Sequence, residues 1–370
     1  MAVIPLYVFV KGPIGNYAIE PASLYESMYR WAGSYTPHIH IPIIITSNTN
    51  FSNVDGVTGG PGTPESPWII EDWYFGAGGE GSSLFIANTT DYLVIRDCWF
   101  STASFNKFHA GIVLQNVTNV RLENNNCNDN GWAGVYLTNA NNTILTDNWC
   151  WDNGRFGIFL EQSNNNTILW NNCSTNMYGI QLTESNNNTL RGNTAINCEQ
   201  SGINIDGSDN NTLTRNRCAF SHFGLELGNP AASSANIVEQ NTPWNTNIGI
   251  HILSASGNTI WGNIIEWSEI GIGNYSFSTN LMEGNSISQT GLFFDFFNFY
   301  GTNTSIHFGF LGYVLLLMTL GSWCLFLLII GSPWLKQRRK LMTKITTAND
   351  LDHLKIEHEA VISELNKDQP

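Results

Sequence analysis

Three acidic residues, Glu161, Asp206 and Glu226, are the strongest candidates for acid–base chemistry in this sequence. Glu161 and Asp206 are 45 positions apart, which is two periods of the repeat described below. Inverting glycosidases hold two carboxyl groups about 6.5–9.5 Å apart, and repeats stacked about 4.8 Å apart would separate this pair by about 9.6 Å. The spacing therefore raises the hypothesis of a polysaccharide hydrolase, with a lyase as its close alternative.

Aromatic and amide side chains recur at the same repeat positions as these carboxylates. The main column contains Tyr136, Phe159, Gln181, Asn204, Glu226 and His251, and the column beside it contains Thr138, Glu161, Thr183 and Asp206. Aromatic rings next to amides and carboxylates are typical of a sugar-binding strip, while a plain solvated face is the alternative. Lyases need basic groups or calcium-binding Asp clusters, and the sequence has no Asp-Asp pair. Binding without catalysis is therefore the preferred interpretation.

Six cysteines precede the last apolar segment: Cys98, Cys127, Cys150, Cys173, Cys198 and Cys218. An even number in an exported domain suggests disulfides. Cys127, Cys150 and Cys173 occupy one repeat position, however, so their Cα–Cβ vectors would be parallel and poorly placed for bridging. Buried free thiols are favoured, and a soft-metal ladder is the alternative. Copper would require Met and His beside the thiols, but the eight His are scattered, so we predict no metal site and no cofactor.

These residues belong to a repeat that runs from Gly111 to Leu292. Each unit begins with a glycine and an alternating apolar pair, as in GIVL, GVYL and GIFL. The glycines are Gly111, Gly134, Gly157, Gly179, Gly202, Gly224, Gly249, Gly271 and Gly291, at spacings of 23, 23, 22, 23, 22, 25, 22 and 20 residues. Alternation with period two indicates strands, and a fixed period of this length indicates a solenoid. The pattern predicts a parallel β-helix with three short strands in each rung of 20–25 residues.

An asparagine follows most of these glycines by 14 residues. The column comprises Asn125, Asn148, Asn171, Asn193, Asn216, Asn241, Asn263 and Asn285. Asparagine tolerates the left-handed backbone that a sharp corner needs, and its amide can hydrogen-bond to the same amide about 4.8 Å away in the next rung. We therefore expect a structural asparagine ladder in the left-handed conformation.

The pattern G-I-x-L, then a turn rich in NNT, then I/L-x-x-N, resembles right-handed β-helix repeat proteins of the NosD and carbohydrate-binding/sugar-hydrolase type. Residues 38–75 are similar to the first segment of archaeal surface members of that group. The resemblance covers roughly residues 38–300 and implies a right-handed parallel β-helix. It also raises copper delivery as an alternative function. The NTD, DD, HG and RIK signatures of polygalacturonases are absent.

Residues 308–332 read as one transmembrane helix. The stretch 308–330 has 23 residues without a charge, which is long enough as a helix to cross a bilayer core of about 30 Å. Lys336, Arg338 and Arg339 follow it, and no Lys or Arg lies in the 20 residues before it. The positive-inside rule thus predicts a single-pass cell-membrane protein with residues 38–300 outside and residues 333–370 in the cytoplasm. For residues 1–37 two readings stay open: either residues 1–10 are the remnant of an export signal, or the signal lies upstream.

The net charge of the chain argues against some classes of binding partner. The net charge is −14, and the last 35 residues carry 7 Lys/Arg and 6 Asp/Glu, which leaves 9 against 24, or −15, for residues 1–335. Such acidity argues against nucleic acid, whose affinity comes from phosphate neutralisation. Sequons that can accept glycans stand at Asn50, Asn88, Asn116, Asn274 and Asn303. The preferred function is a glycoprotein of the cell surface that binds glycans or neighbouring surface proteins without catalysis.

Overall fold

The computed structural model describes residues 8–12, 15–19, 38–79, 81–106, 108–275, 279–288 and 305–307. The chain divides into two compact units, Pro37–Phe308 and a unit made of Met1–Thr36 with Gly309–Pro370. Of the second unit the structure describes β1 (Val8–Gly12) and β2 (Gly15–Ile19), which pair as an antiparallel hairpin. No helix within the described residues is long and apolar enough to cross a membrane, and the predicted span at 308–330 lies outside them.

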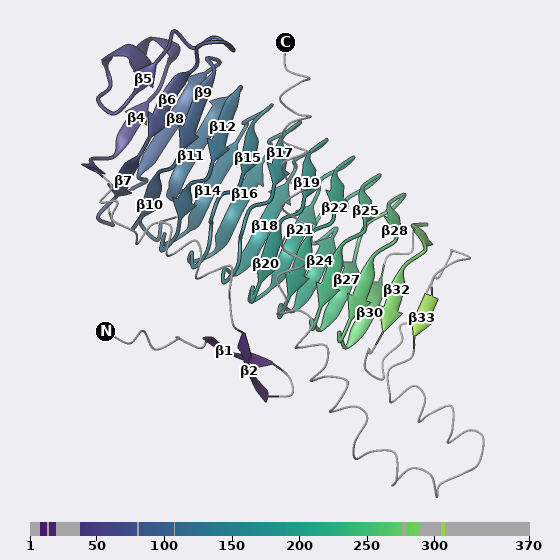
Figure 1. The fold of residues 1–370 in the computed structure, drawn as a ribbon. Coiled ribbons are helices and arrows are strands. Elements are labelled where there is room, and N and C mark those ends of the chain that lie inside the picture. The colour runs from purple at the N-terminus through teal and green to yellow at the C-terminus, as the bar shows by residue number, and fades with distance from the viewer. Residues whose placement is uncertain are drawn as a thin grey trace, which may run out of the picture. The chain divides into compact units, whose positions relative to one another are not determined.

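The Pro37–Phe308 unit is a solenoid of three parallel sheets (Figure 1). Within the described residues, sheet 1 has ten strands: β4 (Ile43–Ile45), β8 (Leu84–Thr89), β11 (Ala110–Val117), β14 (Ala133–Thr138), β16 (Phe156–Glu161), β18 (Tyr178–Thr183), β21 (Ser201–Asp206), β24 (Phe223–Leu227), β27 (Ile248–Ile252) and β30 (Ile270–Asn274). Each strand pairs in parallel with the strand one rung away, as β14 does with β11 and β16.

Sheet 2 begins with β5 (Thr58–Gly59), which pairs antiparallel with the next strand, and then stays parallel. Its other described strands are β6 (Trp68–Glu71), β9 (Leu93–Arg96), β12 (Val120–Glu123), β15 (Ile144–Thr146), β17 (Thr167–Leu169), β19 (Thr189–Arg191), β22 (Thr212–Thr214), β25 (Ile237–Glu239), β28 (Thr259–Trp261) and β31 (Leu281–Glu283). The 3₁₀ helix η1 (Asn48–Asn53) lies between β4 and β5 in the chain.

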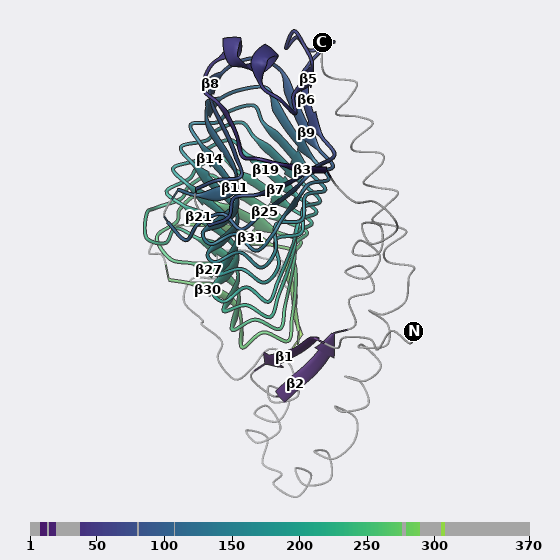
Figure 2. The ribbon, with the colours of Figure 1, turned by 90° about the vertical axis from the view of Figure 1, so that its left-hand side faces the viewer.

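Sheet 3 consists of two runs of strands. The first run is β3 (His38–His40), β7 (Trp73–Gly76), β10 (Trp99–Ser101) and β13 (Asn126–Cys127). The second is β20 (Thr194–Ile196), β23 (Arg217–Ala219), β26 (Thr242–Trp244), β29 (Ile264–Glu266), β32 (Ser286–Ser288) and β33 (Ser305–His307). Single parallel bridges at Trp149 and Asn172 connect the two runs, so the third face is continuous from rung to rung. Figure 2 shows the successive rungs overlapping along the stack.

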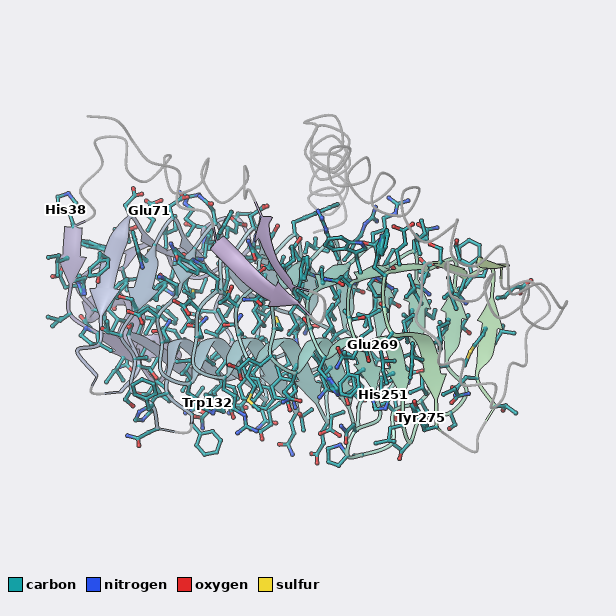
Figure 3. The ribbon with its side chains drawn as sticks, turned by 90° about the horizontal axis from the view of Figure 1, so that it is seen from below. His38, Glu71, Trp132, His251, Glu269 and Tyr275 are labelled. Atoms are coloured by element: carbon teal, nitrogen blue, oxygen red, sulfur yellow. The ribbon has the colours of Figure 1, made fainter. Side chains whose placement is uncertain are left out.

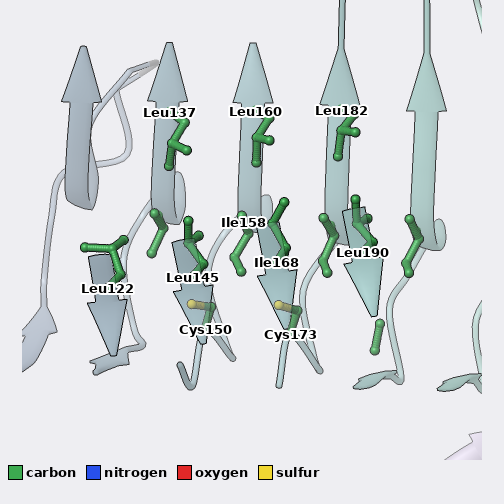
Figure 4. Close-up of a cluster of buried hydrophobic side chains, with 14 of the residues drawn as sticks. Leu122, Leu137, Leu145, Cys150, Ile158, Leu160, Ile168, Cys173, Leu182 and Leu190 are labelled. Atoms are coloured by element: carbon green, nitrogen blue, oxygen red, sulfur yellow. The ribbon is translucent and has the colours of Figure 1, made fainter. Parts of the chain in front are cut away.

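The apolar core fills the interior of the solenoid in columns, as the alternation of apolar residues predicts. Leu137, Leu160 and Leu182 of sheet 1 lie in one row (Figure 4). Leu122, Leu145, Ile168 and Leu190 of sheet 2 form a second row, with Cys150 and Cys173 of the third face beside them. Burying each Leu or Ile in this way contributes about 1.5–3 kcal/mol. The core columns therefore hold the rungs in register and point the intervening side chains outward.

The repeat glycine marks a point of close backbone contact. A Cβ atom on Gly157 would lie 2.6 Å from the carbonyl oxygen of Gly179 and 2.7 Å from that of Cys150. These are backbone atoms that cannot move aside, so any larger residue would force the rungs apart. This contact, and not a left-handed backbone, explains why each repeat begins with glycine.

The eight asparagines of the ladder are buried at the corner between sheets 2 and 3. Nδ2 of each donates to Oδ1 of the next at 2.9–3.0 Å from Asn125 through to Asn285. Nδ2 also donates to a carbonyl of the preceding rung, as from Asn171 to Leu145 at 3.0 Å. The left-handed backbone that we expected at these asparagines is wrong, because it belongs to the residue before each one. Those residues are Asn124, Asp147, Trp170, Gly192, Arg215, Gln240, Gly262 and Gly284.

Two further asparagine ladders occupy the other corners. One lies at the corner between sheets 1 and 2, where Asn188 donates to Asn211 at 3.2 Å and Asn236 to Asn258 at 3.0 Å. The other joins Asn130 to Asn153 at 3.1 Å. The repeat period in the sequence was the signal that could have revealed both. Together the ladders satisfy polar backbone groups that the tight corners would otherwise bury without partners.

Candidate ligand face on sheet 1

The outward side of sheet 1, here called the ligand face, carries the residues proposed from the sequence. Strand register places Tyr136, Phe159, Gln181, Asn204, Glu226 and His251 next to one another on successive rungs, followed by Gly273. The second column brings together Thr138, Glu161, Thr183 and Asp206. Most of the main column is buried, so these side chains pack against their neighbours on the outer side of the sheet. Phe156 and Tyr178, which each precede a repeat glycine, pack beside this column.

The ligand face begins as an aromatic cluster of Trp132, Tyr136, Phe156 and Phe159. The rings of Tyr136 and Phe159 stack with centroids 5.3 Å apart, and those of Phe156 and Phe159 with centroids 4.6 Å apart. Trp132 meets Tyr136 edge-on at 5.0 Å. Phe108, which is 45% exposed, extends this cluster to the surface at 5.8 Å from Trp132. Apolar rings thus reach solvent at one end of the face.

Glu161 is hydrogen-bonded to one member of the aromatic cluster, Tyr136. The hydroxyl of Tyr136 donates a hydrogen bond to Oε2 of Glu161. Burial and the neighbouring Glu161 carboxylate raise the pKa of Tyr136. Glu161 and Asp206 are two rungs apart in the register, with Thr183 between them, as the sequence predicts.

Two amides occupy the middle of the ligand face. Nε2 of Gln181 donates to Oγ1 of Thr183 at 3.2 Å, while Oε1 of Gln181 is buried and accepts no hydrogen bond from the described part of the chain. Oδ1 of Asn204 in the next rung is likewise buried without a partner among the described residues. Leaving a buried acceptor unpaired costs about 1–3 kcal/mol. Two such oxygens on neighbouring rungs thus lie beneath the surface without a donor among the described residues.

The strand β18 is the least covered part of this middle region. Its outward residues Tyr178, Gln181 and Thr183 are all half-buried, whereas those of β21 are buried. A ligand would therefore approach the two amides over β18.

Glu226 has three hydrogen-bond donors in a buried site. Its Oε2 accepts from Oγ of Ser201 at 2.5 Å, and its Oε1 accepts from Nδ2 of Asn229 at 2.7 Å. Nδ1 of His251 lies 3.2 Å from the same Oε1. Burial opposes ionisation, but the hydrogen bonds from His251, Ser201 and Asn229 outweigh it and lower the pKa of Glu226. This carboxyl group is thus held as an anion and is not suited to act as a general acid.

The pKa of Asp206 is shifted in the opposite direction from that of Glu226. Its Oδ1 accepts the backbone N–H of Ala231 at 2.7 Å. Burial, with Glu184 and Glu226 nearby, nevertheless raises the pKa of Asp206 above its ordinary value. Asn229 and Ala231 both belong to the loop of residues 228–236, in the repeat that is longest in the sequence. The extra residues of that repeat therefore cover both carboxylates.

His251 is held between aromatic rings. Its imidazole stacks on Phe223 with centroids 4.3 Å apart and an angle of 9°. Tyr275 meets it edge-on at 5.4 Å (Figure 3). A Cβ on Gly273, the neighbour of His251 in the next rung, would lie 2.8 Å from the Tyr275 ring. The missing side chain at Gly273 is what lets Tyr275 lie beside the imidazole, and sequence reasoning missed this residue.

The comparisons with known proteins agree with this architecture. Residues 79–220 match the family model described as periplasmic copper-binding protein (NosD). The match, the parallel rungs and the structural neighbours together decide the class. The chain is a right-handed parallel β-helix repeat protein. No curated protein sequence matches it significantly.

Solved structures similar to this β-helix include three with TM-scores of 0.50–0.52. The Dettilon tailspike protein gp208 is 12% identical, with 73% of this chain and 61% of that chain covered (TM-score 0.50). The mannuronan C-5 epimerase AlgE6 A-module of Azotobacter vinelandii is 18% identical, with 61% and 66% covered (TM-score 0.52). An alginate lyase from Paenibacillus sp. is 12% identical, with 72% and 99% covered (TM-score 0.51). At these identities the likeness shows the fold alone.

The thiols of the β-helix do not fit a copper site. All six cysteines of the described residues are buried and free. Cys98 stands where a ladder asparagine would, with its N–H donating to Oδ1 of Asn125 at 3.1 Å. Burial raises the pKa of Cys98 and of Cys198 to about 12, so neither supplies a thiolate. At Cys150 burial acts in the same direction, but hydrogen bonds with Cys127 and Cys173 outweigh it and lower the pKa to about 6. Copper(I) prefers thiolate with Met or His, and no cluster of three or more His, Cys, Asp or Glu suited to a metal occurs among the described residues.

The predicted glycan acceptors differ in accessibility. Asn88 and Asn116 are exposed, and Nδ2 of Asn116 donates to Oδ1 of Asn88 at 2.8 Å. Asn50 is half-buried. Asn274 is buried. Asn303 lies outside the described residues.

Proposed function

We propose that this β-helix binds neutral glycans on the ligand face and leaves their glycosidic bonds intact. The observation that carries the proposal is the half-buried strip of Tyr178, Gln181 and Thr183 on β18, whose amide and hydroxyl oxygens lie next to stacked aromatic rings. A pyranose offers C–H groups to an aromatic ring and hydroxyl donors to such oxygens. Specific sites commonly combine apolar walls with a few placed polar groups in this way.

The charge of the face favours a neutral ligand. Glu161, Asp206 and Glu226 lie on it within four rungs, and residues 1–335 carry a net −15. An anionic polysaccharide would be repelled, because like charges in a partly buried site interact strongly. Neutral hexose or pentose chains meet no such barrier.

A cell-surface location is part of the proposal. The charge-free stretch at 308–330 and the basic cluster that follows it support a membrane anchor with residues 38–300 outside. Exposed sequons at Asn88 and Asn116 support a glycosylated exterior. A neighbouring surface protein that carries glycans would then be the partner.

A polysaccharide hydrolase is the second candidate. The raised pKa of Asp206 suits a general acid, and Glu161 lies two rungs away as the base. A glycan panel treated with wild type and with the Glu161→Gln/Asp206→Asn double variant separates the two functions. Reducing ends released by wild type and lost in the variant would make hydrolysis the function.

Copper delivery has support only from the family match over residues 79–220. Because the described residues do not fit a copper site, we do not propose it. Equilibrium dialysis that found copper bound by the full-length protein above background would reopen it.

A glycan array probed with the full-length protein tests the main proposal. We expect binding to neutral glycans without release of reducing ends, and weaker binding by Asn204→Ala. Thr212→Ala on sheet 2 is the matched control, since Thr212 lies on another face of the solenoid. Failure to bind any glycan would overturn the proposal.

A further inference from the structure

Glu226 and His251 form a buried carboxylate–imidazole pair on the neighbouring strands β24 and β27. Nδ1 of His251 lies 3.2 Å from Oε1 of Glu226, and the two side chains are 10% and 2% exposed. Glu226 is an anion that can only accept, so this contact assigns the ring proton to Nδ1. Nε2 is then the nitrogen of His251 that is free to accept a proton.

The imidazole has little freedom to turn. Phe223 stacks on one side of it, and Tyr275 closes its edge. Ser201 and Asn229 fix the carboxylate in turn. Orientation of a histidine by a fixed anion is how proteins prepare a general base. Tyr275 is itself 41% exposed, so the pair lies one ring away from solvent.

We propose that Glu226 and His251 are a general-base dyad that hydrolyses acyl esters carried by glycans on the ligand face. The substrate rests on the function proposed above. Nε2 of His251 takes a proton from water while the water oxygen bonds to the acyl carbon and the C=O electron pair moves to oxygen. The tetrahedral intermediate collapses and expels the sugar oxygen, which takes the proton from Nε2. The products are a carboxylic acid and a free sugar hydroxyl, and water is the only co-reactant.

The surroundings favour an ester over other substrates of a histidine base. Proton abstraction from a uronate would place the substrate carboxylate beside Glu226 and Asp206, where like charges oppose it. An acyl ester is neutral, and its acidic product is repelled once it ionises. Tyr275 meets the imidazole edge-on with centroids 5.4 Å apart, and we expect its phenol to donate to the oxygen that becomes negative.

The test measures acetate release by the full-length protein from acetylated xylan and from p-nitrophenyl acetate. We expect release by wild type and a loss of about 100-fold in His251→Gln. His38→Gln is the matched control, because His38 is exposed and lies on β3, at the other end of the solenoid from the dyad (Figure 3). Its activity should stay within twofold of wild type.

A second variant guards against misfolding. Tyr275→Phe removes one hydroxyl from a partly exposed ring, and we expect about tenfold slower release with an unchanged melting temperature. Absence of acetate release by wild type, or full activity of His251→Gln and Tyr275→Phe, would overturn the dyad. Glycan binding that persists in either case would leave the proposed function standing, so the two can fail separately.

Discussion

Oε1 of Glu226 accepts from Asn229 at 2.7 Å, and both residues belong to the longest repeat of the solenoid. The 25 residues from Gly224 to Gly249 contain three more than the repeats on either side. Those residues build the loop 228–236, which also donates to Asp206 through Ala231. The longest repeat therefore supplies a hydrogen-bond donor to each of two carboxylates, Glu226 with a lowered pKa and Asp206 with a raised pKa.

Glu226→Gln should destabilise the protein at neutral pH. The lowered native pKa means that ionised Glu226 stabilises the fold above its ordinary value of 4.5, and this contribution is lost as pH falls through the native pKa. At pH 7 we expect a loss of about 2 kcal/mol, or roughly 5 °C in melting temperature. Melting curves between pH 3 and pH 8 check this, and a difference that stays constant across the range would contradict it.

Asp206→Asn should stabilise the protein at neutral pH, the reverse of the effect of Glu226→Gln. Because the pKa of Asp206 is raised in the fold, the folded protein favours the protonated form, and stability is lost as pH rises through the native pKa. We expect the variant to melt about 2 °C higher than wild type at pH 7 and no higher at pH 3. The change creates an Asn-Gly-Ser sequon, so the expression host must not add N-linked glycans. A lower melting temperature at pH 7 would show that the Ala231 contact needs the charge.

Asn171→Ala should interrupt the corner ladder. The side chain donates to Leu145, Leu169 and Asn193 and accepts from Asn148, all at 3.0 Å. We expect a loss of about 3 kcal/mol in the free energy of unfolding, measured by urea denaturation. Asn172→Ala is the control, since the half-buried Asn172 side chain bonds Ser174, and it should cost less than about 1 kcal/mol. Equal losses of unfolding free energy in the two variants would mean that the ladder hydrogen bonds stabilise the fold no more than an ordinary side-chain hydrogen bond does.

Most of the fold could be predicted from the sequence, because every rung packs the same kinds of residue at the same positions. Alternation at Ile158 and Leu160 indicated the inward face, and the glycine before them indicated the register. Burial of the ligand face was not visible, since it depends on rings such as Phe156 that fold over a neighbouring column. The left-handed residue was misplaced by one position because Trp170 and Arg215, which adopt it, carry no propensity for it.

The candidate site was predicted in part. Glu226 and His251 already stood in one column, but the sequence could not show that their side chains bond or that Phe223 stacks on the imidazole. Tyr275 lies outside the repeat pattern that identified the others. In the sequence, the one sign of a ring beside His251 was the glycine at position 273, which leaves room for it.

The most direct test of glycan binding is an affinity measurement on variants of the two amides, Gln181 and Asn204. Titration calorimetry with the best neutral glycan from the array should give a dissociation constant about 30-fold weaker for Gln181→Ala/Asn204→Ala than for wild type, since each of the two lost hydrogen bonds is worth about 1 kcal/mol. Thr212→Ala should bind as wild type does. Equal affinity of the double variant and wild type would contradict the claim that the ligand face holds the glycan.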